Sequence, residues 1–102
     1  MSPGNVADYV IEQLKAWGVA RIYGVPGDAI LPLVDAINRH PGIRFISVKH
    51  ESAAALMAAA EAKLTGGIGV CVATSGPGAA NLINGLADAY CDRAPVLAVT
   101  GQ

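Results

Sequence analysis

Apolar positions along the chain alternate between the spacing of helices and that of strands. Near the amino terminus, the i, i+3, i+4 spacing of an amphipathic helix is followed by Val6, Tyr9, Val10, Leu14 and Trp17. Ser2-Pro3 or Asn5 can begin this helix, and Gly18 can end it. A short segment that leans apolar, Arg21 to Tyr23, then predicts a first strand.

A second helix is predicted after the turn at residues 24–27. Asp28 can cap it, and its apolar face is formed by Ile30, Leu33, Val34 and Ile37. Pro32 falls in about the first turn, where proline is tolerated. His40-Pro41-Gly42 ends the helix, and Arg44 to Val48 predicts the second strand.

An alanine-rich helix and two further strands complete the pattern. The helix runs from Ala53 to Leu64 and ends at Gly66-Gly67. Ile68 to Ala73 is a continuous apolar run, typical of a strand buried on both faces. Residues 74–78 turn into another helix, whose predicted inward side chains are Leu82, Ile83, Leu86 and Tyr90. Val96 to Thr100 predicts a fourth strand.

Strands that alternate with helices favour right-handed βαβ units and a parallel sheet with helices on both faces. The sequence therefore predicts a three-layer α/β/α fold. The printed chain ends at Gly101-Gln102, directly after a strand. Because a parallel strand is usually covered on both faces, we expect the sheet to be truncated after the fourth strand, with residues 1–102 as part of a larger domain.

The composition also suggests that the chain is part of a larger domain or assembly. Hydrophobic residues make up 53% of the 102 residues and charged residues only 15%, against about 25% charged in an average globular domain. We therefore expect more chain or a partner subunit to bury part of the apolar surface. The formal net charge is −1, with one Trp, three Tyr and one Phe, so the chain lacks the basic surface and aromatic residues of a nucleic-acid-binding protein.

Cysteine usage and targeting signals suggest a cytoplasmic protein. Cys71 and Cys91 do not form a CxxC motif, and we expect two reduced thiols. No charged segment followed by an apolar one marks a signal peptide. No apolar stretch approaches the roughly 18 residues of a transmembrane helix, so none is predicted.

Three predicted loops lie at the carboxyl ends of strands, the edge where open α/β sheets bind ligands. They are residues 24–27, 49–52 and 74–78. Glycines in the first and third loops allow positive φ or close approach of the backbone. Neither loop matches the dinucleotide fingerprint GxGxxG or the phosphate-binding GxxxxGK[ST].

The second loop carries a single carboxylate, Glu51. An acid at the carboxyl end of a parallel strand, beside much apolar surface, would be desolvated, and desolvation raises the pKa of a carboxyl group. The simpler alternative is a glutamate that opens the alanine-rich helix and is stabilised by the helix dipole.

Five segments together resemble a known family. They are residues 24–27 (GVPG), 49–51 (KHE), 62–66 (AKLTG), 69–78 (GVCVATSGPG) with Asn81, and 95–102 (PVLAVTGQ). This series is similar to the amino-terminal pyrimidine-binding (PYR) domain of thiamine diphosphate enzymes, such as pyruvate oxidase, quinone-dependent pyruvate dehydrogenase and acetolactate synthase. The resemblance covers essentially the whole sequence.

The resemblance implies roles for particular residues. Glu51 matches the catalytic glutamate that hydrogen-bonds N1′ of the cofactor aminopyrimidine and favours its imino tautomer, which takes the proton from C2 of the thiazolium. The cofactor-binding residues it implies are Pro26, Gly27, Glu51, Thr74, Pro77, Gly78 and Asn81. A plain packing role for Pro77 and Gly78 remains an alternative.

We interpret His50 as structural or supporting, and we expect His40 to be solvent-exposed. No metal site is expected on this chain.

The resemblance also implies partners. The substrate would be pyruvate or another 2-oxo acid, and the full-length enzyme would use Mg²⁺ and, in some branches, FAD. The sequence lacks the family's Gly-Asp-Gly and Asn-Asn motif, so a pyrophosphate-binding domain of the same or a second subunit would hold the diphosphate, in a dimer or tetramer. Ser52 departs from the Gln or Glu of many members, and the acceptor of the two-carbon fragment stays open.

Two alternatives come from other functional classes. One is a non-catalytic binding or assembly module that needs a partner supplying the pyrophosphate half. The other is a nucleotide-binding flavodoxin-like or Rossmann domain, which rests on fold analogy alone.

Overall fold

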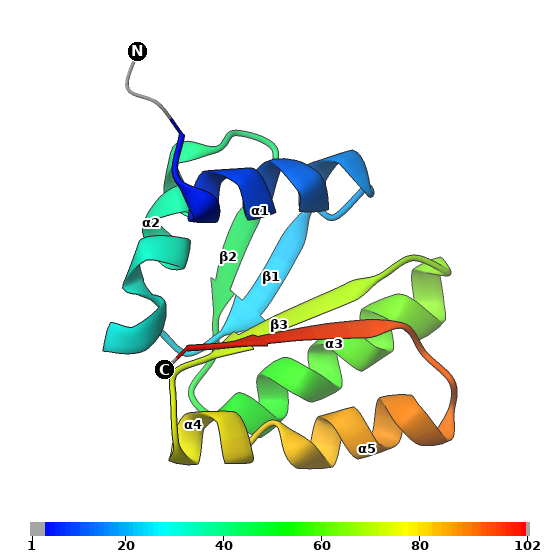
Figure 1. Cartoon of the computed structure of the whole chain (residues 1–102). Coiled ribbons are helices and arrows are strands. Elements are labelled where there is room, and N and C mark those ends of the chain that lie inside the picture. The colour runs from blue at the N-terminus through cyan, green and yellow to red at the C-terminus, as the bar shows by residue number, and fades with distance from the viewer. Residues whose placement is uncertain (1–3, 102) are drawn as a thin grey trace.

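In the computed structural model, which describes residues 4–101, four strands form one parallel sheet in the order β2-β1-β3-β4. The strands are β1 (Arg21–Gly24), β2 (Arg44–Ser47), β3 (Gly69–Ala73) and β4 (Val96–Thr100). Helices α1 (Val6–Ala16) and α2 (Leu31–Arg39) cover one face, and α3 (Glu51–Thr65) and α5 (Ile83–Cys91) cover the other (Figure 1). The predicted three-layer α/β/α fold with a parallel sheet is confirmed.

The strand register places all four carboxyl ends at one edge. β1 pairs with β2 from Arg21↔Arg44 to Gly24↔Ser47, and β3 pairs with β4 along its whole length. All three ladders are parallel. The loops that follow β1, β2 and β3 therefore leave the sheet on the same side, as predicted.

Two clusters of buried side chains lie on opposite faces of the sheet. The cluster under α1 and α2 contains large aliphatic side chains, such as Ile11, Ile22 and Ile37. The cluster under α3 and α5 consists mostly of alanines, together with Tyr23, Cys71 and Leu82. All five residues of β3 are buried, which confirms the prediction of a strand covered on both faces.

Small residues let α3 lie very close to its neighbours. A Cβ atom on Gly69 of β3 would overlap the backbone carbonyl of Ala58. On Gly85 of α5, an added Cβ would overlap the Ala55 side chain and lie 2.6 Å from the backbone nitrogen of Leu56. Both glycines are therefore required for packing, and α3 is held against β3 and α5 by direct backbone contact.

The predicted beginning of α1 is confirmed, but its apolar face is only partly right. Asn5 caps the helix by accepting a hydrogen bond from the Asp8 backbone N–H at 2.9 Å, and Gly18 follows the helix with a φ of +87°. Ile11 and Leu14 are buried. Three of the predicted face residues are more than half exposed: Val6, Tyr9 and Trp17. The alternative beginning at Ser2-Pro3 lies outside the described residues.

The start of the second helix also differs from prediction. Asp28 is not an N-cap but the first residue of a 3₁₀ turn, η1 (Asp28–Ile30), which leads into α2. Neither η1 nor α2 has a side-chain cap. Pro32 lies in the first turn of α2 as predicted, where it costs no helical hydrogen bond.

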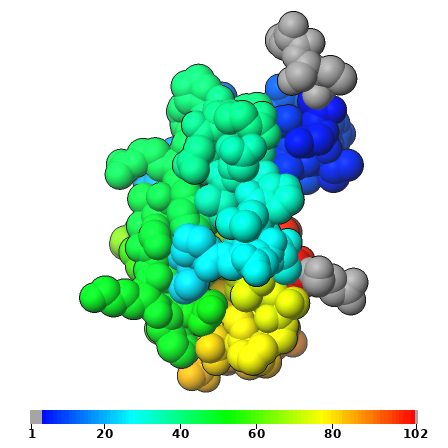
Figure 2. Space-filling view, turned by 90° about the vertical axis from the view of Figure 1, so that its left-hand side faces the viewer, coloured from blue at the N-terminus to red at the C-terminus, as the bar shows by residue number. Residues whose placement is uncertain are grey.

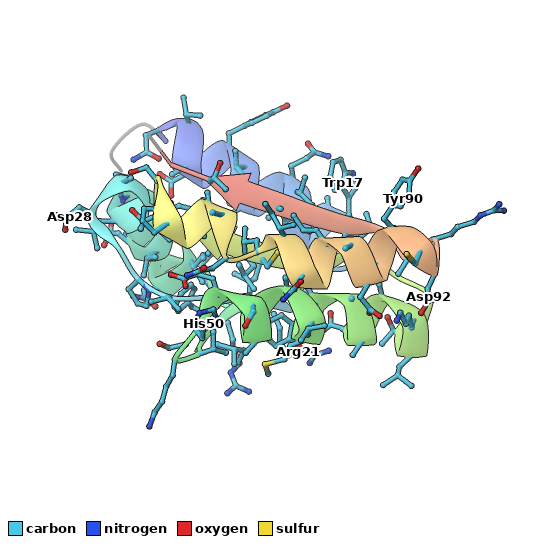
Figure 3. The ribbon with its side chains drawn as sticks, turned by 90° about the horizontal axis from the view of Figure 1, so that it is seen from below. Trp17, Arg21, Asp28, His50, Tyr90 and Asp92 are labelled. Atoms are coloured by element: carbon cyan, nitrogen blue, oxygen red, sulfur yellow. The ribbon has the colours of Figure 1, made fainter. Side chains whose placement is uncertain are left out.

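The segment after β3 forms two helices where one was predicted. A short α4 (Pro77–Ala80) is followed by a break at Asn81 and Leu82, and then by α5. Leu82 is buried as predicted, and the buried residues of α5 are Gly85 and Ala89. Ile83 and Tyr90 are 63% and 85% exposed, so their predicted inward orientation is wrong, and Tyr90 points away from α3 (Figure 3).

The expectation that His40 is solvent-exposed is also wrong. Its side chain is only 16% exposed and its Nε2 lies 2.9 Å from Asp8 Oδ1, which also accepts a hydrogen bond from Arg39 Nη1 at 2.7 Å. The hydrogen bond to His40, followed by the backbone N–H of Asn5, lowers the pKa of Asp8 to about 2. The packing of the first turn of α1 against the end of α2 brings these groups together, which no local pattern reveals.

Replacing Gly85 with alanine should destabilise the fold. Helix propensity alone favours alanine by about 1 kcal/mol, but the added Cβ meets backbone atoms that cannot rotate away. We expect the free energy of unfolding to fall by about 1 kcal/mol or more in urea denaturation. The matched control is Gly67→Ala, whose Cβ would have its nearest contact at 3.4 Å, with Thr65 Oγ1. Equal stability of the two variants would contradict the packing argument.

Asp8 should contribute to stability against acid. Its pKa in the folded chain lies below the ordinary value of 3.8, so its ionised form stabilises the fold fully above about pH 4, and this contribution is lost as the pH falls toward 2. Thermal melts between pH 6 and pH 2 should therefore show a smaller loss of Tm for Asp8→Asn than for the unmodified chain. Glu12→Gln, which removes an exposed carboxylate from the same helix, is the matched control, and an equally reduced loss of Tm in this variant would contradict the role of Asp8.

Candidate functional site

The loops after β1 and β3 and the first turn of α3 meet at the carboxyl edge of the sheet. Figure 2 views the molecule from this side, where the segment after β1 (cyan), the beginning of α3 (green) and α4 (yellow) adjoin one another. The candidate site is the surface that these three segments form around Glu51.

Glu51 is the first residue of α3 and is half-buried. Its Oε1 accepts a hydrogen bond of 3.1 Å from the side-chain amide of Asn81, which lies at the break between α4 and α5. These two predicted site residues, separated by 30 positions in the sequence, are therefore in direct contact.

The predicted rise in the pKa of Glu51 is wrong for this structure. Its pKa is lowered, mainly by the hydrogen bond from Asn81 and then by its own backbone N–H, and a smaller opposing effect comes from burial. The sequence correctly indicated apolar surroundings on the inner side of α3. It could not show that the outer side is open or that an amide donor stabilises the ionised form.

Glycines join Glu51 to the loop after β1. A Cβ on Gly78 would lie 3.3 Å from Glu51 Oε2 and 3.0 Å from Thr74 Cγ2. On Gly27, an added Cβ would lie 2.6 Å from Thr74 Cβ. The hydroxyl of Thr74 also accepts a hydrogen bond from the Ala29 backbone N–H at 3.3 Å. Gly27, Thr74, Gly78 and Glu51 therefore form a continuous row of close neighbours.

The remaining predicted site residues lie beside this row. Pro26 and Pro77 are exposed, and they are the chain neighbours of Gly27 and Gly78. Pro77 is the first residue of α4. Of the glycines in these loops, Gly76 has a positive φ of +70°, whereas Gly27 is extended at −158°. Gly27 is therefore needed for close approach to Thr74 and not for its backbone conformation.

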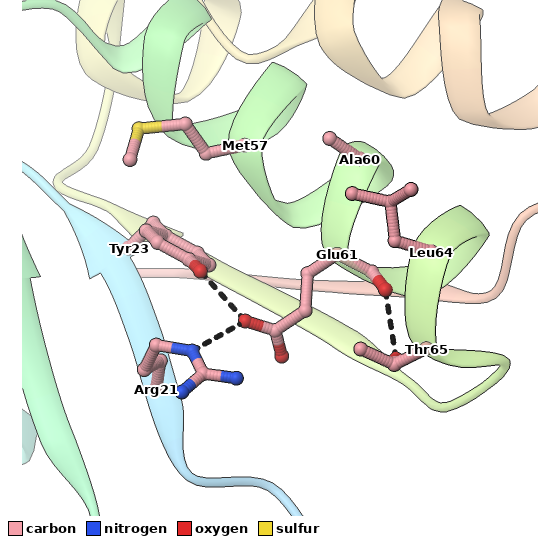
Figure 4. A pocket seen from close by; sticks show the side chains of 7 residues that line it. All are labelled: Arg21, Tyr23, Met57, Ala60, Glu61, Leu64 and Thr65. Atoms are coloured by element: carbon pink, nitrogen blue, oxygen red, sulfur yellow. Dashed lines mark hydrogen bonds and ion pairs between the residues drawn. The ribbon is translucent and has the colours of Figure 1, made fainter.

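Sequence reasoning missed a second polar cluster, at the far end of α3. Glu61 Oε1 accepts hydrogen bonds from Tyr23 Oη at 2.6 Å and from Arg21 Nε at 2.7 Å (Figure 4). The cluster lines a pocket of about 340 Å³, together with Met57, Ala60, Leu64 and Thr65. The pKa of Tyr23 is raised, mainly by burial and then by the hydrogen bond to Glu61. Ten residues of helix, about 15 Å, separate Glu61 from Glu51, so the two glutamates belong to different surfaces.

Two features are absent from the described residues, 4–101. No group of three or more His, Cys, Asp or Glu side chains is arranged to hold a metal ion. No helix in this range is both long and apolar enough to span a membrane. Cys71 is buried and Cys91 is exposed, and both are free thiols.

Comparison with known proteins identifies the family. Residues 4–102 match the family model of the thiamine pyrophosphate enzyme N-terminal TPP binding domain. The chain belongs to this family. The resemblance drawn from the five sequence segments is thereby confirmed across nearly the whole chain.

Individual relatives agree with this assignment. The chain is 53% identical to YdaP of Bacillus subtilis over 103 aligned residues, covering 100% of the chain and 18% of that protein. It is 50% identical to the acetolactate synthase isozyme 2 large subunit of Escherichia coli, over 96% of the chain and 18% of the relative. It is 51% identical to the pyruvate oxidase of Lactiplantibacillus plantarum, over 91% of the chain and 16% of the relative. The chain thus spans less than a fifth of these relatives.

Replacing Asn81 with leucine should raise the pKa of Glu51 toward its ordinary value, because leucine has a similar size but cannot donate a hydrogen bond to the carboxylate. A ¹³C NMR titration of the Glu51 carboxyl group would measure the change. Asn84→Leu is the matched control, since Asn84 is an exposed asparagine three residues further along, in the first turn of α5. An unaltered Glu51 titration in Asn81→Leu would show that this hydrogen bond does not govern the carboxyl group.

Proposed function

We propose that this chain supplies the aminopyrimidine-binding half of the active site of a thiamine diphosphate enzyme that acts on pyruvate or a related 2-oxo acid. The observation that carries the proposal is the contact of Glu51 with Asn81 beside the row formed by Gly27, Thr74 and Gly78. The membership of the chain in the thiamine pyrophosphate family supports the same conclusion.

The described residues fit an aminopyrimidine ring. Asn81 occupies Oε1 of Glu51, and Oε2 faces Gly78, which has no side chain to fill the adjacent space. A flat ring could therefore approach Oε2 over the backbone of Gly78. Thr74 and Gly27 continue this narrow surface, and the exposed Pro26 and Pro77 flank it.

Glu51 would hold or share a proton with a ring nitrogen of the bound cofactor. Thiamine diphosphate supplies the electron sink that makes decarboxylation of a 2-oxo acid possible. The protein's contribution is to position the carboxyl group and to set its proton affinity. Asn81 does the first by fixing Oε1, which leaves Oε2 for the ring.

The pyrophosphate half would be supplied by another domain, of the same or a second subunit. Apolar side chains that are well exposed lie on the helices beside the site, among them Leu56 on α3 and Ile83 on α5. Exposed side chains of this kind mark an interaction surface when they lie together. Docking of the second half against this surface, in a dimer or tetramer, fits the excess of apolar residues in the sequence.

Docking would also change the proton affinity of Glu51. In the chain alone, the hydrogen bond from Asn81, followed by that of its own backbone N–H, keeps the pKa of Glu51 low. Covering the site would remove water from the carboxyl group and shift its pKa upward. The raised pKa expected from the sequence would thus be a property of the assembled active site, where a carboxyl group must share its proton with a weak ring base.

The relatives include both a synthase and an oxidase at about the same identity. We therefore leave the acceptor as oxygen with phosphate, a quinone or a second 2-oxo acid. Mg²⁺ would bind with the diphosphate on the other half. FAD would be present only if the protein belongs to a flavin-containing branch, and a cytoplasmic location would suit all of these activities.

The test is a pair of substitutions on one helix, made in the full-length protein. Glu51→Gln should lower the rate of pyruvate decarboxylation by about 100-fold or more, because the amide cannot exchange a proton with the ring. Glu61→Gln, at the far end of α3, should leave the rate within about twofold, since glutamine can still accept from Tyr23. Activity is measured with each acceptor in turn.

Other outcomes would contradict the proposal. If Glu51→Gln retained wild-type activity, the catalytic role would be wrong. If the unmodified full-length protein bound its partner half but neither thiamine diphosphate nor pyruvate, a non-catalytic assembly module would be the better interpretation.

A further inference from the structure

His50 makes an unusual cap at the beginning of α3. Its Nδ1 accepts a hydrogen bond from the backbone N–H of Ser52 at 3.1 Å, and the Ser52 hydroxyl lies 2.7 Å from the same nitrogen. Caps of this kind are usually provided by Ser, Thr, Asp or Asn, whose side-chain oxygen accepts the N–H. An imidazole can replace them only through a ring nitrogen that carries no proton.

This requirement fixes the tautomer of His50. The backbone N–H of Ser52 can only donate, so Nδ1 must offer its lone pair. The proton of the neutral ring is then on Nε2. A ring protonated on both nitrogens could not accept this bond, and its positive charge would lie at the unfavourable end of the helix dipole.

The turn that His50 closes is the one that begins with Glu51. The hydrogen bond spans Glu51 from the residue before it to the residue after it. The close contacts that hold α3 to the sheet and to α5 lie further along the helix, at Ala55 and Ala58. The side chains of residues 51–53 are only half-buried, so packing alone constrains the first turn less than the middle of the helix.

We propose that His50, as its Nε2–H tautomer, is a positioning residue that closes the first turn of α3 and thereby holds Glu51 against Asn81. Figure 3 shows His50 at the beginning of α3. The catalytic meaning of this positioning rests on the function proposed above, whereas the tautomer and the contact between Glu51 and Asn81 do not. They can therefore be tested without cofactor or substrate.

The first test is on the unmodified full chain labelled with [¹⁵N]histidine. Long-range ¹H–¹⁵N NMR spectra at neutral pH distinguish the two neutral tautomers, and the loss of signals in His50→Asn assigns those of His50 among the two histidines. We expect the proton on Nε2. A proton on Nδ1 would overturn the proposal, and this result needs no destabilised variant.

The second test compares His50→Ala with His50→Asn. Alanine removes the cap, so amide exchange of Ser52 and Ala53 should accelerate by about tenfold, and the Asn81 side-chain amide signals should move as the contact with Glu51 is lost. Asparagine can cap a helix with its side-chain oxygen and should restore both readouts. Unchanged Asn81 signals in His50→Ala would overturn the proposal.

The matched control is Asn5→Ala, which removes the equivalent cap of α1. It should lower overall stability to a similar extent but leave the Asn81 signals in place. If Asn5→Ala moved these signals as much as His50→Ala does, the effect would be general destabilisation, and the positioning role would be wrong. If only catalysis failed while the NMR results held, the proposed function would be at fault and not the role of His50.

Discussion

The close backbone packing of α3 against β3 and α5 is the contact on which the site depends. Gly69 and Gly85 have no Cβ at the points where Ala58 and Ala55 approach. A helix that lay one side chain further out could not place its first turn beside the turn after β3. The alanine-rich sequence of α3, which looks merely apolar, is therefore what brings Glu51 within hydrogen-bond distance of Asn81.

The hydrogen bond between Asn81 and Glu51 has two effects that oppose each other. It orients the carboxyl group, which a catalytic role requires, and it stabilises the ionised form, which lowers the pKa. A carboxylate that only opened a helix would need no such partner, because the backbone N–H groups of the first turn suffice. The added amide contact supports the proposal that the carboxyl group is held for a ligand. A domain or subunit that covered the open side would then raise the pKa of this group by desolvation.

The sequence predicted the layers and the strands, because each depends on a local pattern, whereas the candidate site residues came from the resemblance to a family. The period of apolar residues identifies the helices, and the continuous run at β3 identifies a central strand. The sequence did not predict the contacts that depend on the exact rotation of a helix about its axis. Ile83 and Tyr90 lie on the outer side because α5 packs against α3 through Gly85, and the packing of α1 on α2 brings His40 to Asp8.

The same distinction explains why the sequence indicates Glu51 as a candidate but not the direction of its pKa shift. Family motifs indicate Glu51 through its neighbours in the sequence, but a pKa depends on which groups surround the carboxyl group in space. Glu51 lies beside Asn81 and Gly78 and is only half-buried, so part of its side chain is open in the described structure. A partner that closed the open side would add the desolvation that the sequence suggested, while Asn81 and the cap at His50 would keep the carboxyl group in place. The chain thus fixes the position of the acid, and the assembled protein would set its strength.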